Sequence, residues 1–266
     1  MRRRPMLIAA LAGTLLCAAP ASAQTPQERE RLAWLFDRGR LIHGLDRAAW
    51  LATDDMMARI PNPAGSGMRG YIVEREGDGF AVVFYGGERE APVAFYRASV
   101  RNNRLVSSRV YPADARPALT AVQRRMSEVR ALAGSLGLRS CNEAPFNTVV
   151  IPPETPEAPI DLYLLTPQLS HREWPAGGHY RVTVEPDRRL GASRAFANSC
   201  LTLSAPPGTV GLVMTHLLDP LPTEIHVFTA LASGLPLFVG TIESRRRWEV
   251  DGGGIRLIEG DAPGGG

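Results

Sequence analysis

The sequence predicts an α+β protein: N-terminal helices and an antiparallel meander covered by a long amphipathic helix, followed by a mostly antiparallel β half. Two observations predict this class. Apolar residues recur every three or four positions soon after residue 25 and again over residues 119–136, which is the spacing of one helix face. Most of the remaining chain consists of short runs rich in aromatic and β-branched residues, separated by turn-forming residues.

The first 23 residues have the pattern of a cleavable secretory signal. Three arginines at positions 2–4 precede an apolar run from Met6 to Ala19, and Ala21-Ser22-Ala23 supplies the small residues that a signal peptidase accepts. The apolar run is shorter than the roughly 18 residues that a spanning helix needs, although a retained membrane anchor is the alternative. We therefore expect export to the periplasm, with a mature chain that begins at Gln24 and has no membrane span.

Loss of this segment changes the charge balance. The whole chain has 30 basic and 27 acidic residues, and three of the basic residues lie in the signal, so the mature chain carries no formal net charge. All basic residues are arginines, which excludes a lysine Schiff base. The run Arg245-Arg246-Arg247 followed by Trp248 could grip nucleic acid, but we interpret it as a turn that leads into a strand. No nucleic-acid partner is expected.

Cys141 and Cys200 are the two cysteines that remain after signal cleavage. An even pair in an oxidising compartment predicts one disulfide bond. The competing interpretation is a reactive thiol with a histidine base, which a second nearby cysteine disfavours.

The mature chain is predicted to open with two helices. Thr25 and Glu28 have the spacing of a capping box, and Gly39 can end the helix that they begin. Asp46 can cap a second helix, which Pro61 stops.

An antiparallel meander and a long helix are predicted next. The meander runs are 71–76, 80–85, 91–97 and 105–111. Turn-rich segments separate them, as expected for hairpins. A helical stripe then runs from Leu119 to Leu136, and we expect it to cover the sheet.

A change of composition after Gly137 divides the predicted architecture. We expect a signal peptide over residues 1–23, an N-terminal α+β domain over 24–137, a β-rich domain over 138–259 and a disordered tail over 260–266. The predicted strands of the second half are 161–166, 179–185, 212–217, 224–231, 235–241, 247–250 and 255–258. The segment 224–231 could instead be a helix capped by Thr223, but its β-branched content favours a strand.

One polar cluster could carry metal chemistry. If residues 216–226 form a hairpin with a five-residue loop, His216 and His226 face each other, and Asp219 or Glu224 could complete a zinc site. A six-residue loop would place the two histidines on opposite faces. The alternative is that these are solvated or hydrogen-bonded structural groups.

His179 follows a glycine pair that permits close backbone approach, either to a ligand or in a bulge. No phosphate-binding loop, serine-hydrolase elbow or clustered cysteine motif occurs in the sequence. We expect an exported binding or envelope-associated protein without catalytic activity or cofactor, with a zinc-dependent hydrolase that uses the His216–His226 hairpin as the alternative.

Overall fold

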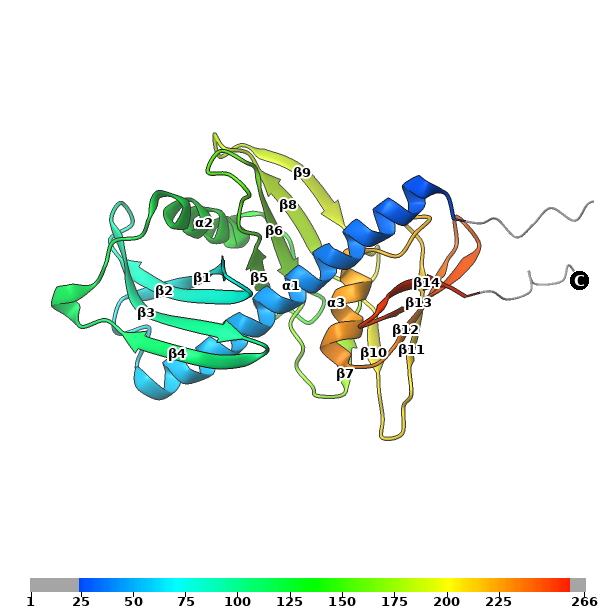
Figure 1. Ribbon diagram of the computed structural model, residues 1–266, viewed down its shortest axis with the longest axis horizontal. Coiled ribbons are helices and arrows are strands. Elements are labelled where there is room, and N and C mark those ends of the chain that lie inside the picture. The colour runs from blue at the N-terminus through cyan, green and yellow to red at the C-terminus, as the bar shows by residue number, and fades with distance from the viewer. Residues whose placement is uncertain (1–23, 259–266) are drawn as a thin grey trace, which may run out of the picture.

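The computed structural model describes residues 24–258, so the predicted signal and tail lie outside the described residues. Its longest element is the helix α1, Pro26–Arg59, which runs diagonally across the molecule (Figure 1). A meander lies along the C-terminal part of α1, and the sheet formed by the last strands lies near its N-terminal part. The predicted α+β class is confirmed. Across the described range, no helix combines the length and apolarity needed to cross a membrane.

The helix α1 begins as predicted. The backbone N–H of Glu28 donates to Oγ1 of Thr25, and the N–H of Thr25 donates to Oε2 of Glu28, both over 3.1 Å. The helix ends with Ile60 as its C-terminal cap, directly before Pro61. A capping box and a following proline therefore mark both ends of the helix correctly.

The prediction that Gly39 divides this segment into two helices is wrong. Gly39 lies inside α1, where the helix α3, Glu224–Ser233, packs against it. A Cβ atom at Gly39 would lie 2.4 Å from Cβ of Val227, so the glycine allows close helix packing. Asp46, predicted as a cap, lies inside the same helix.

The predicted meander is present as one antiparallel sheet, ordered β1-β2-β3-β4. Its strands are β1 Met68–Glu76, β2 Gly79–Gly87, β3 Pro92–Arg101 and β4 Arg104–Val110. The helix that follows is shorter than the predicted stripe. The sequence forms a 3₁₀ turn at Ala113–Ala115, α2 at Ala121–Ala131 and a second 3₁₀ turn at Leu132–Ser135.

The meander is buried on both faces, by α1 on one and α2 on the other. Val82 and Phe84 of β2 belong to the core cluster that includes α1, whereas Val83 belongs to the cluster that includes Met126 of α2. The same two clusters contain β6 residues, Tyr163 in the first and Leu162 in the second. The two cores therefore continue from the meander into the second half of the chain.

The second half contains three sheets within the described residues. The first, β5-β6-β8-β9, is antiparallel and comprises Asn147–Val150, Ile160–Leu165, Tyr180–Val184 and Leu190–Ala195. The second pairs β7, Glu173–Pro175, with β10, Thr202–Ser204. The third, β11-β12-β13-β14, comprises Leu212–His216, Leu237–Thr241, Arg246–Asp251 and Gly254–Leu257.

The predicted strand at 224–231, and with it the predicted hairpin, is wrong. This segment is the helix α3, which follows Thr223 and ends at Gly234 with a φ of 67°. Because a helix connects them, β11 and β12 pair in parallel rather than as a hairpin. Ile225, Val227 and Ala230 are buried, so tertiary packing outweighs their strand propensity.

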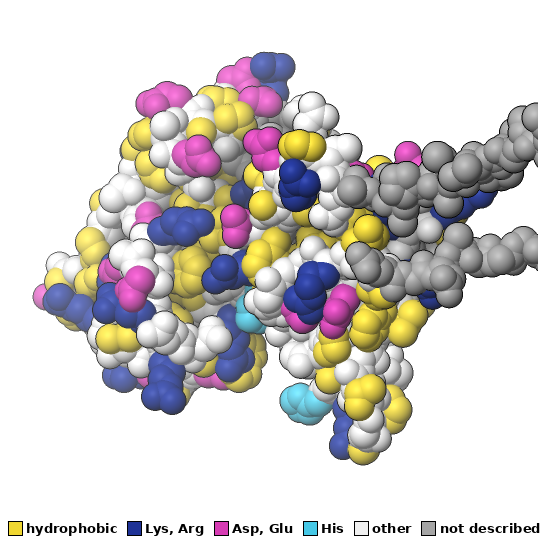
Figure 2. Space-filling view, turned by 45° about the vertical axis from the view of Figure 1, so that its right-hand side comes forward, with side chains coloured by type: hydrophobic (Ala, Val, Ile, Leu, Met, Phe, Trp, Pro, Cys, Tyr) yellow, Lys and Arg dark blue, Asp and Glu magenta, His cyan; other side chains and the backbone are white. Residues whose placement is uncertain are grey.

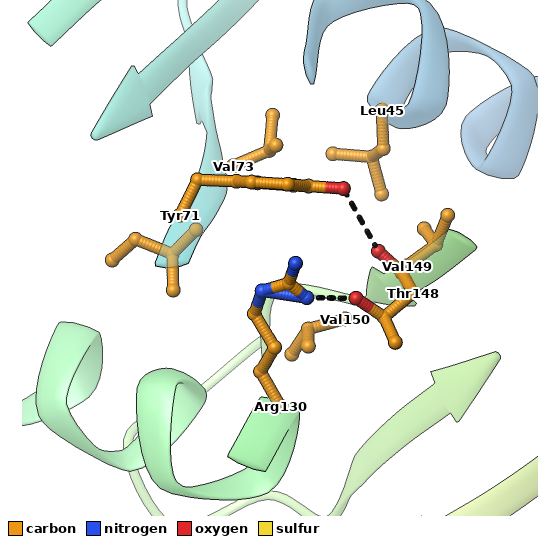
Figure 3. A pocket seen from close by; sticks show the side chains of 8 residues that line it. Leu45, Tyr71, Val73, Arg130, Thr148, Val149 and Val150 are labelled. Atoms are coloured by element: carbon orange, nitrogen blue, oxygen red, sulfur yellow. Dashed lines mark hydrogen bonds between the residues drawn. The ribbon is translucent and has the colours of Figure 1, made fainter. Parts of the chain in front are cut away.

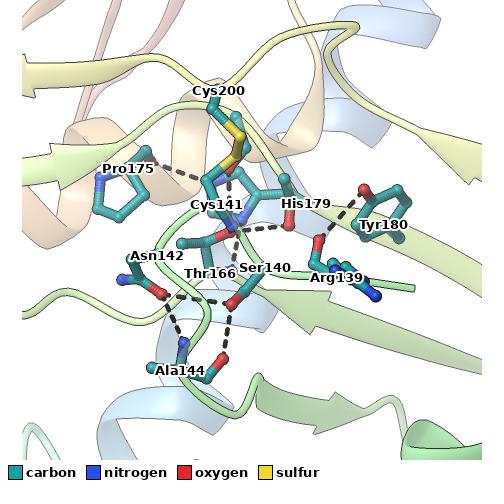
Figure 4. The surroundings of a disulfide bond; sticks show 12 residues. Arg139, Ser140, Cys141, Asn142, Ala144, Thr166, Pro175, His179, Tyr180 and Cys200 are labelled. Atoms are coloured by element: carbon teal, nitrogen blue, oxygen red, sulfur yellow. Dashed lines mark hydrogen bonds between the residues drawn. A yellow bond between two sulfur atoms is a disulfide. The ribbon is translucent and has the colours of Figure 1, made fainter. Parts of the chain in front are cut away.

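The predicted disulfide is confirmed between Cys141 and Cys200, whose Cα atoms are 5.3 Å apart (Figure 4). The glycine pair Gly177-Gly178 packs against the two cross-linked loops. A Cβ atom at Gly177 would lie 2.1 Å from the carbonyl oxygen of Ser199, and one at Gly178 would lie 2.6 Å from Sγ of Cys141. Both glycines are therefore needed for the close approach of the cross-linked loops.

Candidate functional site

A cleft of about 510 Å³ lies between α1, α3 and the segment that joins β6 to β7. Sites for small ligands usually have volumes of roughly 300–1,000 Å³. In the space-filling view, a notch opens at the lower edge of the molecule, and histidine side chains lie on its border (Figure 2). The cleft lining includes His43, Asp46, Arg47, Trp50, Trp174 and Phe228.

Asp46 provides the carboxyl group of the cleft. No other residue of the described range pairs with it through a hydrogen bond or an ion pair. Burial raises the pKa of Asp46 to about 6, although the charge of Arg47 acts in the opposite direction. The carboxylate is therefore ionised at neutral pH, and within residues 24–258 it makes no direct hydrogen bond or ion pair.

His43 lies one helical turn before Asp46. Burial, reinforced by the charge of Arg47, lowers the pKa of His43. The ring is 6.4 Å from the ring of Phe228, measured between centroids. At neutral pH His43 is therefore an uncharged imidazole on the cleft wall, which can donate one hydrogen bond and accept another.

Arg47 provides the positive charge of the cleft lining. Its guanidinium carbon lies 4.2 Å from the centroid of the Trp50 ring, and within residues 24–258 it has no carboxylate partner. Trp50 is 53% exposed. Trp174 also lines the cleft, and its Nε1 is buried without a hydrogen-bond acceptor among the described residues. The lining thus combines aromatic surface with polar groups that lack a direct partner among the described residues.

His179, the predicted ligand-binding residue, lies in the cleft wall and is 1% exposed. Its Nδ1 accepts a hydrogen bond from the N–H of Thr166 over 3.2 Å, and its Nε2 lies 3.0 Å from the carbonyl oxygen of Pro175. Burial lowers the pKa of His179 to about 4, although the bond to Pro175 partly opposes this. Both ring nitrogens therefore contact backbone groups of the cleft wall. The Thr166 hydroxyl also accepts from the N–H of Cys141, so the wall is tied to the disulfide (Figure 4).

A second, much smaller cavity of about 10 Å³ lies between β1, α2 and β5 (Figure 3). Arg130 stacks over the ring of Tyr71 at 4.1 Å and donates to Oγ1 of Thr148. The Tyr71 hydroxyl donates to the Thr148 carbonyl over 3.5 Å. This volume holds about one water molecule, so the polar groups here have a structural role.

Three of the predicted metal ligands, His216, His226 and Asp219, lie together, although not in a hairpin. His216 ends β11 and His226 lies in the first turn of α3, and their ring centroids are 4.7 Å apart. Nε2 of His216 is 2.7 Å from Oδ2 of Asp219, which also accepts from Arg194 over 2.6 Å. The N–H of Thr223 donates to Nδ1 of His226 over 2.8 Å.

The electrostatics of this cluster follow from its burial. Burial lowers the pKa of His226 to about 3, and the charges of His216 and Arg194 act in the same direction. Burial alone would raise the pKa of Asp219, but the hydrogen bond from His216 and the charge of Arg194 outweigh it, and the pKa is lowered. Asp219 is therefore an anion held between two nitrogen donors.

Glu224, the fourth predicted ligand, points elsewhere. Its Oε1 accepts hydrogen bonds from the Tyr163 hydroxyl and from Arg181, each over 3.0 Å, and the side chain is fully buried. Its Oε2 has no hydrogen-bond partner among the described residues. In the part of the chain that the structure describes, no group of three histidine, cysteine or acidic side chains is arranged to hold a metal ion. The zinc site remains a prediction.

The arginine run near the C-terminus is built into the third sheet. Trp248 is fully buried, and its Nε1 donates to Oγ1 of Thr241 over 3.1 Å. Arg246 pairs with Glu28 of α1 over 2.7 Å. The indole is therefore covered by protein and cannot stack on a base.

No protein-family model, curated protein or solved structure matches this chain. Its function must be inferred from its own geometry. The cleft is the strongest candidate because it combines sufficient volume with unpaired polar groups.

The sequence contained one signal for this cleft. Relative to His43, the residues Asp46, Arg47 and Trp50 lie three, four and seven positions later, which is the spacing of one helix face. A helix end at Gly39 and a new cap at Asp46, which the sequence predicts, would place His43 outside the second helix and so divide this polar stripe.

Proposed function

We propose that this chain is an exported, non-enzymatic protein that binds a small ligand in the cleft beneath α1. The observation that carries the proposal is the unpaired, mostly buried carboxyl group of Asp46 in a cleft of about 510 Å³. A folded protein rarely leaves a buried charge without a partner, and a ligand can provide that partner.

Export to the periplasm is part of this proposal. The signal pattern of residues 1–23 supports it, and the disulfide between Cys141 and Cys200 is compatible with an oxidising compartment. Expression of the whole chain in a Gram-negative host, followed by fractionation, tests it. We expect a periplasmic protein that starts at Gln24, and an uncleaved cytoplasmic product would refute the assignment.

A ligand screen tests the binding function. The chain from Gln24 is mixed with amino acids, peptides, sugars, nucleosides and organic acids, and thermal unfolding is measured. A ligand that binds the folded state raises the melting temperature. We expect at least one compound class to do so.

A variant that fills the cleft tests whether the ligand binds there. Ala232 lies on the cleft wall, so Ala232→Trp should abolish the stabilisation. Ala58→Trp is the matched control, because Ala58 is exposed on α1 and does not line the cleft. Stabilisation that survives Ala232→Trp, or a screen without hits, would count against the cleft as a binding site.

A zinc-dependent hydrolase is the second candidate. It is supported by the 4.7 Å approach of the His216 and His226 rings beside Asp219. Zinc titration of the purified chain, compared with a His216→Ala and His226→Ala double variant, tests it. Stoichiometric zinc that the double variant loses would favour the hydrolase, and equal zinc content in both proteins would refute it.

A further inference from the structure

Two opposite charges line the cleft, and no direct hydrogen bond or ion pair joins them among the described residues, although the charge of Arg47 lowers the pKa of Asp46. Asp46 and Arg47 are adjacent in α1, so their side chains leave the helix about 100° apart. Within the described chain, Asp46 has no hydrogen bond or ion pair, and Arg47 contacts the Trp50 ring without a carboxylate partner. The cleft therefore presents to its contents one anion and one cation that make no direct ion pair among the described residues.

The rest of the lining is suited to an apolar group with a peptide-like polar atom. Phe228, Leu165 and Pro175 provide apolar surface. Nε1 of Trp174 is a buried donor without an acceptor, which a carbonyl oxygen can satisfy. His43 adds an uncharged donor and acceptor on the same wall.

We propose that the cleft binds a zwitterion, either a free amino acid or a short peptide with an apolar side chain. Its ammonium group pairs with Asp46 and its carboxylate pairs with Arg47. This inference rests on the proposed binding function and names its ligand class.

Charge complementarity favours a zwitterion over other ligands. A simple anion would bury Asp46 beside a like charge. A simple cation would bury Arg47 beside a like charge. Each arrangement is unfavourable. A neutral ligand such as a sugar would leave both charges without a direct ion-pair partner. A zwitterion satisfies both of them at once.

The test compares the dipeptide leucyl-phenylalanine with two blocked forms. N-acetylation removes its ammonium group, and C-terminal amidation removes its carboxylate. Free leucine and free phenylalanine complete the series. Trp50 and Trp174 line the cleft, so tryptophan fluorescence reports binding, and calorimetry gives an independent dissociation constant. We expect each blocked form to bind at least tenfold more weakly than the free dipeptide.

Variants then assign each charge. Asp46→Asn should weaken the free dipeptide at least tenfold and leave the acetylated form unchanged, because that form has already lost its ammonium group. Arg47→Gln should weaken binding of the free dipeptide at least tenfold and leave binding of the amidated form unchanged, because that form has already lost its carboxylate. Asp37→Asn and Arg31→Gln are the matched controls on α1. Asp37 is exposed, and Arg31 stacks on Trp34 at 4.3 Å with the same spacing in sequence as Arg47 and Trp50.

The outcomes separate this inference from the proposed function. Blocked dipeptides that bind as tightly as the free one would overturn the zwitterion assignment, with or without the variants. If another compound class binds and Ala232→Trp abolishes it, the binding function stands and the zwitterion assignment fails. If no compound binds in the cleft, both fail.

Discussion

Substitution of Gly39 by alanine is a direct test of how α1 and α3 pack. In an exposed helix, glycine to alanine stabilises by about 1 kcal/mol. Here the added Cβ would lie 2.4 Å from Cβ of Val227 and 2.6 Å from the carbonyl oxygen of Glu224. Overpacking usually costs about 1–3 kcal/mol, and a backbone carbonyl cannot rotate away, so we take the upper end. The net expectation is a loss of about 2 kcal/mol in the free energy of unfolding.

Thermal unfolding followed by circular dichroism measures this effect. For a chain of this size, a loss of about 2 kcal/mol lowers the melting temperature by roughly 4–8 °C. Gly134→Ala is the control, since no atom lies within 4 Å of a Cβ atom built there. It should leave stability unchanged or slightly raised. A Gly39→Ala protein as stable as the parent would refute the packing argument, because α3 could not then lie so close to α1.

Three further predictions concern charge and covalent structure. Asp46→Asn should stabilise the protein by about 1–2 kcal/mol at pH 8 and by almost nothing at pH 4. The reason is that the folded-state pKa of about 6 lies above the ordinary 3.8, so the destabilisation by the charged form develops as the pH rises from about 4 to 6 and is fully present above pH 6. Melting curves across this pH range check it, and a pH-independent difference would contradict it. Replacing both Cys141 and Cys200 with serine should lower the free energy of unfolding by about 2–4 kcal/mol in guanidinium titrations, since the bond spans 59 residues. An unchanged midpoint would count against this. Glu224→Ala should cost about 3 kcal/mol, because Arg181 loses its carboxylate partner, whereas Glu224→Gln should cost less. Equal losses for both would argue against the ion pair.

Helix ends and strand runs could be predicted because they depend on neighbouring residues. The hydrogen bonds between Thr25 and Glu28 join residues three positions apart, the run at 80–85 lies within β2, and β4 covers the run at 105–111 except for its last residue. The disulfide could be predicted by counting, since Cys141 and Cys200 are the two cysteines that lie outside the predicted signal.

The errors arose where distant parts of the chain meet. Gly39 is typical of a helix end, and only the approach of Val227, 188 positions later, explains a glycine inside a helix. The β-branched residues of 224–231 favour a strand locally, yet burial against α1 makes them a helix. Local propensity differs between states by about 1 kcal/mol per residue or less, so the burial of several apolar side chains outweighs it.

The sequence by itself determined the α+β class, the start of α1, the helix stop before Pro61 and the pairing of the cysteines. The tertiary structure decided where Asp46 and Arg47 lie, because α3 and the segment before β7 complete the cleft around α1. It also decided that Glu224 pairs with Arg181, whereas His216 forms a hydrogen bond with Asp219. Those choices depend on which surfaces become buried together, and a linear pattern of residues does not contain that information.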